Sequence, residues 1–554
     1  MKKKVNKIAI LCFLIVIALV CVICAVLAVR QSGSSEETEE STEEAAQAQD
    51  YDGEENSGLS EEEEEFQAFI EDTVYDVDEQ ETIREDLDEK KEADSYTPEN
   101  ILVEYNPFGT NTLSLYIYFE TEDAASVSYT VHTDEDGVND YSHDAYQDED
   151  YQTEHEFQVI GLYPNSENTV TFEITYEDGS SETTEIKYEM GSLNGDEEIQ
   201  LEKTEYSDSE ELEDGLYVIL GNDDSKVDFM YYYDNDGIIR GEVPIIAYRA
   251  HRLLFDDNTM FYSISKTQIA RMDRLGQIVD VYDLGEYKLH HDYVFDDNGN
   301  ILILATDTTQ RTEEDCVVML DVETGEVTEV IDFCDYFTDY MEECVEQAGE
   351  DEDEVDWFHL NTIQWMGDDS ILLSAREVST IVKVTNIYDT PEIEYLLGSE
   401  DFWKELGYED LVYEQDGDFT LQGGQHSVTY VEDNSLEDGQ YYIYMFNNNI
   451  GISNSNPDFD WSSIGLTNTE GMGGDTSYYY EYLVDENDGT FTLTDSFEVP
   501  YSGYVSSAQN IGTHTIIDSG IPGIFSEYDE NHELIASFTM ETEKYIYRVY
   551  KYEW

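Results

Sequence analysis

The sequence has little positive charge. It contains 25 Lys and Arg against 130 Asp and Glu in 554 residues, which gives a formal net charge of −105. Because nucleic-acid binding needs clustered Lys and Arg to neutralise phosphates, this deficit excludes a nucleic-acid partner. Proline is also scarce, with 8 residues, which together with only 35 Gly excludes collagen-like and proline-rich chains. The 40 % of hydrophobic residues can still fill more than one core at roughly 150 residues per domain.

Cysteine is sparse outside the first thirty residues. Three of the 6 Cys lie in an apolar N-terminal run, which leaves Cys316, Cys334 and Cys344. No CxxC motif and no Cys/His spacing of a zinc site occurs, so we predict no metal site. Pairing of Cys334 with Cys344 as a disulfide is left open by the sequence.

One apolar run is long enough to cross a membrane. Residues 8–29 carry no charge, and Lys2, Lys3, Lys4 and Lys7 precede them. At about 1.5 Å per residue this run spans the hydrocarbon core, and the leading positive charge places the N-terminus in the cytoplasm. We therefore predict a signal anchor over residues 1–30, in a single-pass protein of the cell membrane whose remaining domains are extracellular. A cleaved signal peptide is the alternative.

Residues 31–95 are predicted to form an acidic stalk. The Glu-rich blocks at 36–44 and 61–65 lack the apolar density that would offset chain entropy, so they should be solvated and self-repelling. Near the end of the stalk, Phe66, Phe69, Ile70, Val74 and Val77 fall at helical spacing. This spacing predicts a helix that docks on the domain that follows.

The rest of the chain is predicted to be all-β and to form two domains. Short β-rich runs separated by Asp-Gly turns indicate a small β-sandwich of fibronectin or immunoglobulin kind over residues 96–200. From residue 201 to 554, strand–turn–strand units with Asp-containing turns recur six times, at residues 231–239, 270–278, 318–327, 381–389, 482–489 and 525–531. With a basic repeat of about forty residues, these hairpins predict a six-bladed β-propeller.

A second repeated element alternates with these hairpins. It places a polar residue four positions before an aromatic one: His251 before Phe255, His291 before Phe295, Asn361 before Trp365 and His426 before Tyr430. In a propeller the innermost strand of each blade lines the central channel. We therefore expect His291, Asn361 and His426 to converge on one point, whereas His251 is read as a core residue.

Four motifs occur in order along this region. They are His-His-Asp at 290–292, Asp-Trp-Phe-His-Leu-Asn at 356–361, Ser-Ala-Arg at 374–376 and Gly-Gln-His at 424–426, the last with Phe-Asn-Asn-Asn at 446–449. Together they resemble the bacterial aryl-sulfate sulfotransferase family, which works without the adenosine phosphosulfate donor. The resemblance covers residues 96–554 and implies a β-propeller that follows a β-sandwich, in a protein exported from the cytoplasm.

The resemblance also implies a site and a reaction. Members of the family move a sulfuryl group from a phenolic sulfate ester to a phenolic acceptor, by a ping-pong mechanism through a sulfohistidine. By motif, the nucleophile corresponds to His426. The other catalytic residues are expected to be His291, His359 and Arg376, with Asn361 and His290 binding substrate; whether His290 or His291 lies in the site is left open. We prefer His291 because it shares a register with Asn361 and His426.

Residues of these types suit the chemistry. A neutral imidazole is a competent nucleophile near neutral pH, and a guanidinium can hold two sulfuryl oxygens as a fork. We expect no cofactor, and as partners a phenolic sulfate donor, a phenolic acceptor and the membrane; a homodimer is left open. Two other functions stay as alternatives, a non-catalytic cell-surface ligand-binding propeller and an aryl-sulfate hydrolase.

Overall fold

The computed structural model describes residues 59–207, 211–221, 227–349, 354–471, 473–542 and 544–553. The predicted signal anchor and residues 31–58 of the predicted acidic stalk lie outside these residues. Among the residues that the structure does describe, no helix combines the length and apolar character needed to cross a membrane.

The described end of the predicted stalk is helical. It comprises α3 (Glu61–Phe69), η1 (Ile70–Val74) and α4 (Val77–Ala93). The chain starts α3 with a capping box, in which the Ser60 hydroxyl and the Glu63 carboxylate each accept a backbone N–H of the other residue. Ile70 and Val74 are fully buried in a core that they share with the following domain. The helical spacing of apolar residues therefore corresponds to real helices, which pack on the folded part of the chain.

The next domain is a β-structure organised around one long strand. Its strands are β1 (Leu102–Tyr105), β2 (Ser114–Thr133), β3 (Tyr141–Asp144), β4 (Gln152–Ile160), β5 (Glu167–Tyr176) and β6 (Ser181–Glu189). The first half of β2 pairs with β1 and β4, and its second half pairs with β3 and β5. Alternate residues of β2 are buried around Phe157 and Phe172, which form the centre of this core.

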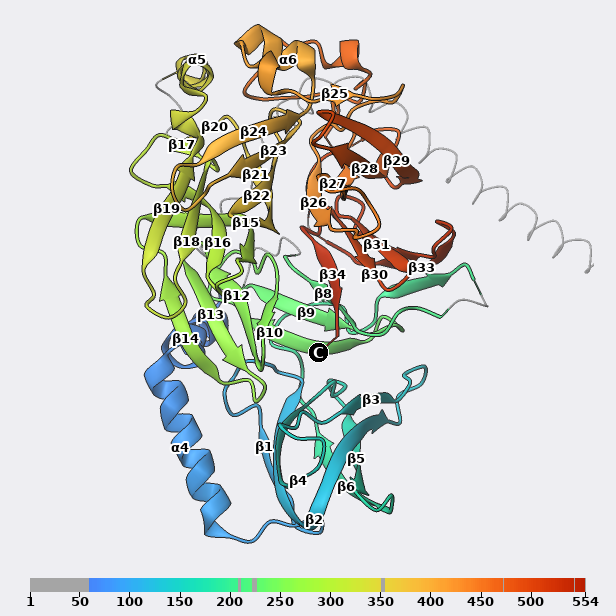
Figure 1. The fold of residues 1–554 in the computed structure, drawn as a ribbon. Helices are drawn as coiled ribbons and strands as arrows, with labels where there is room; N and C mark the ends of the chain where they lie inside the picture. Colours follow the sequence, from blue (N-terminus) through green and yellow to red (C-terminus); the bar gives the residue numbers. More distant parts are fainter. Residues whose placement is uncertain are drawn as a thin grey trace, which may run out of the picture. The chain divides into compact units, whose positions relative to one another are not determined.

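Six sheets follow, antiparallel except where β25 pairs with β29, and each of the six predicted hairpins lies in a different one (Figure 1). The first sheet consists of β8 (Leu216–Ile219), β9 (Phe229–Tyr233) and β10 (Ile239–Pro244) with β34 (Val549–Tyr552). The second consists of β11 (Leu254–Asp256), β12 (Thr259–Ser265), β13 (Gln268–Asp273) and β14 (Ile278–Asp283). The third consists of β15 (Tyr287–Phe295), β16 (Ile301–Asp307), β18 (Cys316–Leu320) and β19 (Val327–Asp332).

The last three sheets continue the same order along the chain. The fourth sheet consists of β21 (Leu360–Gly367), β22 (Ser370–Ala375), β23 (Thr380–Thr385) and β24 (Glu392–Leu397). The fifth consists of β25 (Glu414–Gln415), β26 (His426–Val431), β27 (Gln440–Asn447), β28 (Ser477–Asp485) and β29 (Thr490–Val499). The sixth consists of β30 (Ser507–Ile511), β31 (His514–Ser519), β32 (Ile524–Tyr528) and β33 (Leu534–Thr539) with β7 (Glu202–Glu205).

The two ends of this region are paired into shared sheets. The C-terminal β34 pairs with β8 in the first sheet, and β7 pairs with β33 in the last one. Neighbouring sheets also contact each other through strands at one edge of each: β15 contacts β21, β21 contacts β26, β26 contacts β30, and β30 contacts β34. Three of these edge strands, β15, β21 and β26, carry the polar-before-aromatic element, so the chain brings the strands of His291, Asn361 and His426 into contact.

The short insertions form small elements between these sheets. They include the parallel pair β17 (Thr312–Glu313) and β20 (Val355–Asp356), the helices α5 (Thr338–Ala348) and α6 (Glu400–Leu406), and the 3₁₀ turns η2 (Phe333–Asp335), η3 (Glu409–Leu411) and η4 (Trp461–Ile464). Cys316, Cys334 and Cys344 are free, buried thiols. The disulfide that the sequence left open between Cys334 and Cys344 is therefore not formed.

Candidate active site

The predicted site residues lie where edge strands depart from regular pairing. The register between β15 and β16 shifts between Leu289 and Tyr293, a stretch that contains His290 and His291. The β21–β22 register shifts around Asn361, and the β26–β27 register shifts directly after His426. Bulges of this kind re-aim side chains and are common beside active sites. Three separate strands therefore turn polar side chains out of their sheets at the same edge.

Backbone strain accompanies these irregularities. His291, His359 and Ser427 have φ angles of 57°, 55° and 55°, in the left-handed region that residues with a Cβ rarely occupy. Each such residue costs of order 1–3 kcal/mol and persists only where its surroundings enforce it. Two of the predicted catalytic histidines are thus held in conformations that stability alone does not favour.

His426 is held through one ring nitrogen. Its Nδ1 lies 3.0 Å from the Gly424 carbonyl oxygen and 2.8 Å from Asn448 Oδ1, both acceptors, so Nδ1 carries the proton. The Asn448 amide is oriented by its Nδ2, which donates to the carbonyls of Ser502 and Val505 at 2.9 Å and 3.0 Å. Burial, reinforced by the Arg376 charge, lowers the pKa of His426 well below 6.5. The ring is therefore neutral, with its lone pair on Nε2.

His359 is positively charged, in contrast to the neutral His426. Its Nδ1 lies 2.6 Å from Asp356 Oδ2 and 2.7 Å from Glu314 Oε2, and all three side chains are nearly inaccessible to solvent. Burial alone would lower the pKa of His359, but the two carboxylates outweigh it and raise the pKa well above 6.5. His359 is thus an imidazolium at neutral pH, next to a neutral His426.

His291 lies between these groups. Its ring centroid is 4.7 Å from that of His359, its Nε2 lies 3.1 Å from Glu314 Oε2, and its Nδ1 lies 2.9 Å from the Tyr547 hydroxyl. The groups whose charges lower the pKa of His426 are Arg376, His291 and His359, and His290 is not among them. His291 is therefore near enough for its charge to act on His426.

Arg376 and Asn361 attach to the same framework. The Arg376 backbone N–H donates to the His359 carbonyl, and its Nη1 lies 3.2 Å from Glu377 Oε1 and 3.9 Å from Asp356 Oδ2. Asn361 is fully buried and donates from Nδ2 to the Gln425 carbonyl at 2.8 Å, directly before His426 in the chain. One amide N–H of Asn361 therefore supports the His426 backbone, and the other stays available as a donor.

His290 points elsewhere in the same cluster. Burial lowers its pKa to about 4, so the ring is neutral. The Ala305 backbone is near enough to raise this pKa slightly, yet neither ring nitrogen makes a hydrogen bond of normal geometry with any described residue. His290 also lies beside Glu314.

Several residues of this cluster were not predicted. Asp356 and Asn448 do lie inside the quoted motifs, at 356–361 and 446–449, and their proximity to the histidines could have drawn attention to them. Glu314 and Tyr547 carry no such signal, because Glu314 is one of 130 acidic residues and Tyr547 one of 44 tyrosines. Only tertiary contacts single them out.

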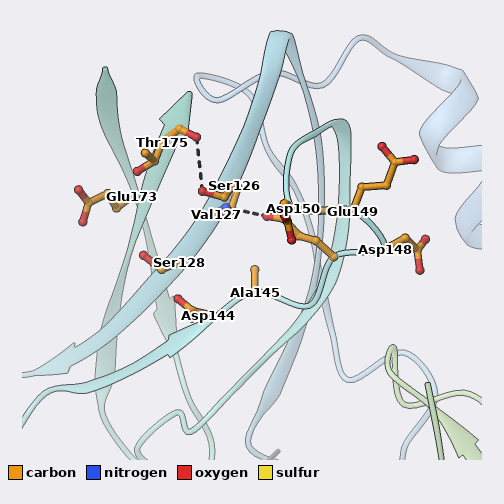
Figure 2. A pocket seen from close by; sticks show the side chains of 11 residues that line it. Ser126, Val127, Ser128, Asp144, Ala145, Asp148, Glu149, Asp150, Glu173 and Thr175 are labelled. Carbon is orange, nitrogen blue, oxygen red and sulfur yellow. Dashed lines mark hydrogen bonds between the residues drawn. The ribbon is translucent and has the colours of Figure 1, made fainter. Parts of the chain in front are cut away.

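A second hollow lies in the N-terminal β-domain (Figure 2). This cleft of about 530 Å³ is lined by Ser126, Val127, Ser128, Asp144, Ala145, Gln147, Asp148, Glu149, Asp150, Glu173 and Thr175. Gln147 Oε1 accepts the Val127 N–H at its base. Five carboxylates and no cation line the cleft, so it repels anions and contains no nucleophile with an adjacent base. The histidine cluster is therefore the better candidate for catalysis.

Comparison with known proteins gives family matches in both domains. The model of the family described as "Arylsulfotransferase (ASST)" matches residues 202–550, and that described as "Arylsulfotransferase Ig-like domain" matches residues 102–191. No curated protein sequence matches the chain.

Solved structures give only distant similarity. A functionally unknown protein from Desulfotomaculum acetoxidans is 9% identical over 60% of this chain and 95% of its own, with a TM-score of 0.33. An auxiliary nutrient binding protein from Bacteroides thetaiotaomicron is 10% identical over 81% of this chain and 99% of its own, with a TM-score of 0.30. The WD40 domain of Toxoplasma gondii coronin is 9% identical over 62% and 76%, with a TM-score of 0.29. At such TM-scores none of these structures supports a functional argument.

Proposed function

Because this chain belongs to the arylsulfotransferase family, we propose that it moves a sulfuryl group from a phenolic sulfate ester to a phenolic acceptor by a ping-pong mechanism through a sulfohistidine on His426. The observation that carries the proposal is the charge state of this histidine. Nδ1 is locked as the donor to Gly424 and Asn448, and the low pKa keeps the ring neutral, so Nε2 has a lone pair for attack.

In the first half-reaction His426 Nε2 attacks sulfur in line with the departing oxygen. The N–S bond forms as the S–O bond to the phenol breaks, and the bond's electron pair leaves on the phenolate. His359, charged at neutral pH through Asp356 and Glu314, donates a proton to that oxygen. In the second half-reaction the acceptor phenol returns its proton to His359 as its oxygen attacks sulfur, and the N–S electron pair returns to His426.

The peripheral sulfuryl oxygens keep their negative charge throughout. Among the cations, Arg376 has the charge that most lowers the pKa of His426, which supports a role for its guanidinium in binding a group there. Its planar fork suits two such oxygens, and the second amide N–H of Asn361 suits a third. His291 lies beside the His359 ring and contacts the same Glu314 carboxylate as His359.

We also propose that the six sheets are the blades of a β-propeller. This reading is supported by six antiparallel sheets in chain order, by the contacts between consecutive edge strands, and by closure through the β8–β34 and β7–β33 pairs. The site would then lie in the central channel. We further propose that residues 8–29 anchor the protein in the cell membrane with this domain outside the cell.

The experiment that tests this function follows nitrophenolate release from p-nitrophenyl sulfate by the full-length chain, with and without phenol. Ping-pong transfer predicts release that phenol accelerates, together with a sulfuryl mass on the peptide that contains His426. Release that is indifferent to phenol, with inorganic sulfate as product, would instead indicate a hydrolase. An absence of release from several aryl sulfates would favour a binding propeller.

Asn448 offers a test of how the nucleophile is positioned. In Asn448→Ala, Nδ1–H loses its side-chain acceptor, so we expect kcat for the first half-reaction to fall by about 10–100-fold with little change in KM. Asn448→Asp, which keeps an acceptor, should retain more activity than Asn448→Ala. Asn449→Ala, in the same loop, is the matched control, because the Asn449 amide binds the Thr476 carbonyl instead. A rise in KM with an unchanged kcat would contradict the positioning role.

Ionic strength should affect the two half-reactions differently. A chain with a net charge of −105 repels an anionic aryl sulfate, and the Debye length shrinks from about 30 Å at 0.01 M to about 8 Å at 0.15 M salt. We therefore expect kcat/KM for the sulfate donor to rise over this range. The neutral phenol acceptor is the internal control, and its kcat/KM should stay constant. A fall for the donor would indicate that local positive charge outweighs the net charge.

A further inference from the structure

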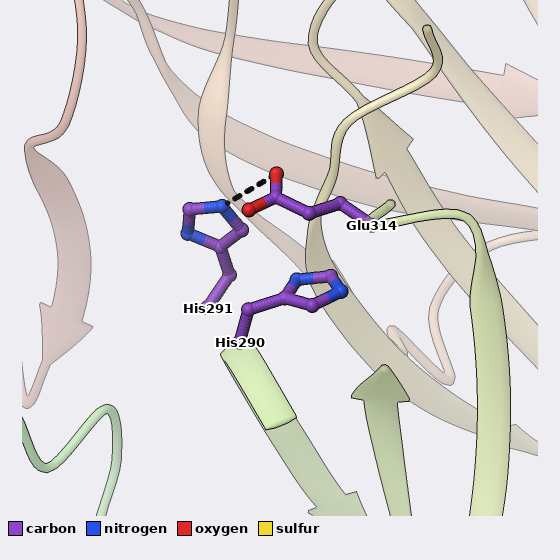
Figure 3. Close-up of side chains that lie close together, drawn as sticks. All are labelled: His290, His291 and Glu314. Carbon is purple, nitrogen blue, oxygen red and sulfur yellow. Dashed lines mark hydrogen bonds and ion pairs between the residues drawn. The ribbon is translucent and has the colours of Figure 1, made fainter. Parts of the chain in front are cut away.

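Two histidines and a glutamate meet in the buried cluster beside His359. His290 and His291 lie in the bulge of β15, and Glu314 lies between β17 and β18 with a φ of 56° (Figure 3). One ligand atom of each, a ring nitrogen or a carboxylate oxygen, lies within 4.8 Å of the other two, and all three side chains are buried. Two imidazoles and one carboxylate are a common ligand set for divalent transition metals.

The hydrogen bonds of His291 determine its tautomer. The Tyr547 hydroxyl donates its single proton to the His291 carbonyl at 3.2 Å, so its oxygen accepts from His291 Nδ1 at 2.9 Å. In a neutral ring, Nε2 then carries a lone pair, and this lone pair faces Glu314 Oε2 at 3.1 Å. Two lone pairs at this distance repel unless a cation lies between them. The Nδ1–H···Tyr547 bond is also the outer contact that metal-bound histidines usually make.

His290 supplies an independent observation. It is 5 % exposed, and neither of its ring nitrogens hydrogen-bonds a described residue. An imidazole buried without a partner is costly, because it has lost water without replacing its hydrogen bonds. Coordination of a metal by the nitrogen that lies near Glu314 would supply the missing interaction.

The local charge also favours a cation. Glu314, Asp356 and Glu377 contact His359 or Arg376, so three carboxylates gather around these two basic side chains. An aryl sulfate brings one further negative charge. A divalent ion at Glu314 would reverse the sign of the site before the substrate enters.

We propose that His290, His291 and Glu314 bind a divalent transition metal, with Zn²⁺ the best match to two neutral imidazoles and a carboxylate. Such a three-ligand site keeps an open coordination position. That position would accept a sulfuryl oxygen, a consequence that rests on the proposed function. Metal binding itself does not depend on the proposed function, because it is proposed for the protein without substrate.

Metal binding to the full-length chain tests this proposal. The chelator-treated protein is titrated with Co²⁺ and then Zn²⁺, in the presence of excess Ca²⁺ and Mg²⁺ to occupy surface carboxylates. We expect one equivalent of Co²⁺ to give visible d–d absorption that Zn²⁺ abolishes. In His290→Ala and in Glu314→Gln, the Co²⁺ affinity should fall by more than about tenfold. His155→Ala, which removes a buried histidine of the N-terminal domain with one unpartnered nitrogen, should bind as the wild type does.

Other outcomes would overturn the proposal. Absence of a bound equivalent in the wild-type protein would mean that a proton, and not a metal, separates His291 from Glu314. A thiolate-to-Co²⁺ charge-transfer band would place the metal at Cys334, beside Asp315 and Asp332. Failure of the proposed function is distinguishable from both, since sulfuryl transfer is measured with aryl sulfate and the metal titration contains none.

Discussion

Replacing His426 by alanine is expected to abolish both half-reactions, with a loss of at least about four orders of magnitude in nitrophenolate release. The reason is that His426 combines a neutral charge state, a protonated Nδ1 that leaves the Nε2 lone pair free for attack, and the influence of the Arg376 charge. The sulfuryl-enzyme should also disappear from the mass spectrum. Because the pKa of His426 lies well below 6.5, the acid limb of the wild-type kcat/KM profile should fall below this value as well.

The matched control for this variant is His251→Ala. His251 is a fully buried histidine that the sequence pattern places at the equivalent position of another sheet, and its Nδ1 contacts Ser263. Its removal should cost stability and leave turnover per folded molecule unchanged. Turnover at the wild-type rate in His426→Ala would eliminate His426 as the nucleophile.

His359→Gln is expected to have the second largest effect, and the effect should depend on the leaving group. Loss of a general acid costs about 10²–10⁴-fold, because the phenolate must then leave without a proton. Unsubstituted phenyl sulfate, with a poor leaving group, should suffer most, whereas p-nitrophenyl sulfate should lose little. The pKa of His359 is raised well above 6.5, so the alkaline limb for phenyl sulfate should lie above this value in the wild type and vanish in the variant.

Two observations would contradict this role for His359. An equal loss with both substrates would mean that the side chain binds the sulfuryl group or supports the fold and does not protonate the leaving oxygen. An unchanged alkaline limb in the variant would assign the acid to another group. In Asp356→Asn, which removes one of the two carboxylates that raise the pKa, the alkaline limb should move to lower pH.

The strain at the site argues that these positions serve function. His291, His359 and Glu314 all occupy the left-handed region, and Glu314 joins the two histidines through one carboxylate oxygen. Glycine would relieve the strain at each position but would remove the side chain that the cluster uses. The fold therefore holds its ionisable groups in place at the expense of some stability.

Much of the architecture could be read from local patterns. The six Asp-containing turns correspond to hairpins in six different sheets, because turn chemistry depends on a few consecutive residues. The polar-before-aromatic element likewise marked the edge strands that carry His291, Asn361 and His426. The helical spacing between Phe66 and Val77 anticipated α3, η1 and α4 inside a region otherwise predicted as stalk.

The chemistry of the site could be read only in part. The residue types and their order, with their resemblance to a known family, were enough to name His426, His359, Arg376 and Asn361. The sequence could not distinguish His290 from His291, because the bulge in β15 that separates their roles arises from pairing with β16. It also could not find Glu314 or Tyr547, whose side chains matter only through contacts with residues distant in the chain.

The sequence by itself thus indicated the all-β class, the order of the sheets and a candidate nucleophile, since these depend on short patterns of turn, strand and motif residues. Tertiary structure decided the charge states. Burial and the Arg376 charge keep His426 neutral, with Asn448 fixing its tautomer, whereas Asp356 and Glu314 make His359 an imidazolium, although both residues are histidines. The physical reason is that a buried pKa depends on desolvation and on the nearest charges, and neither is a property of the local sequence.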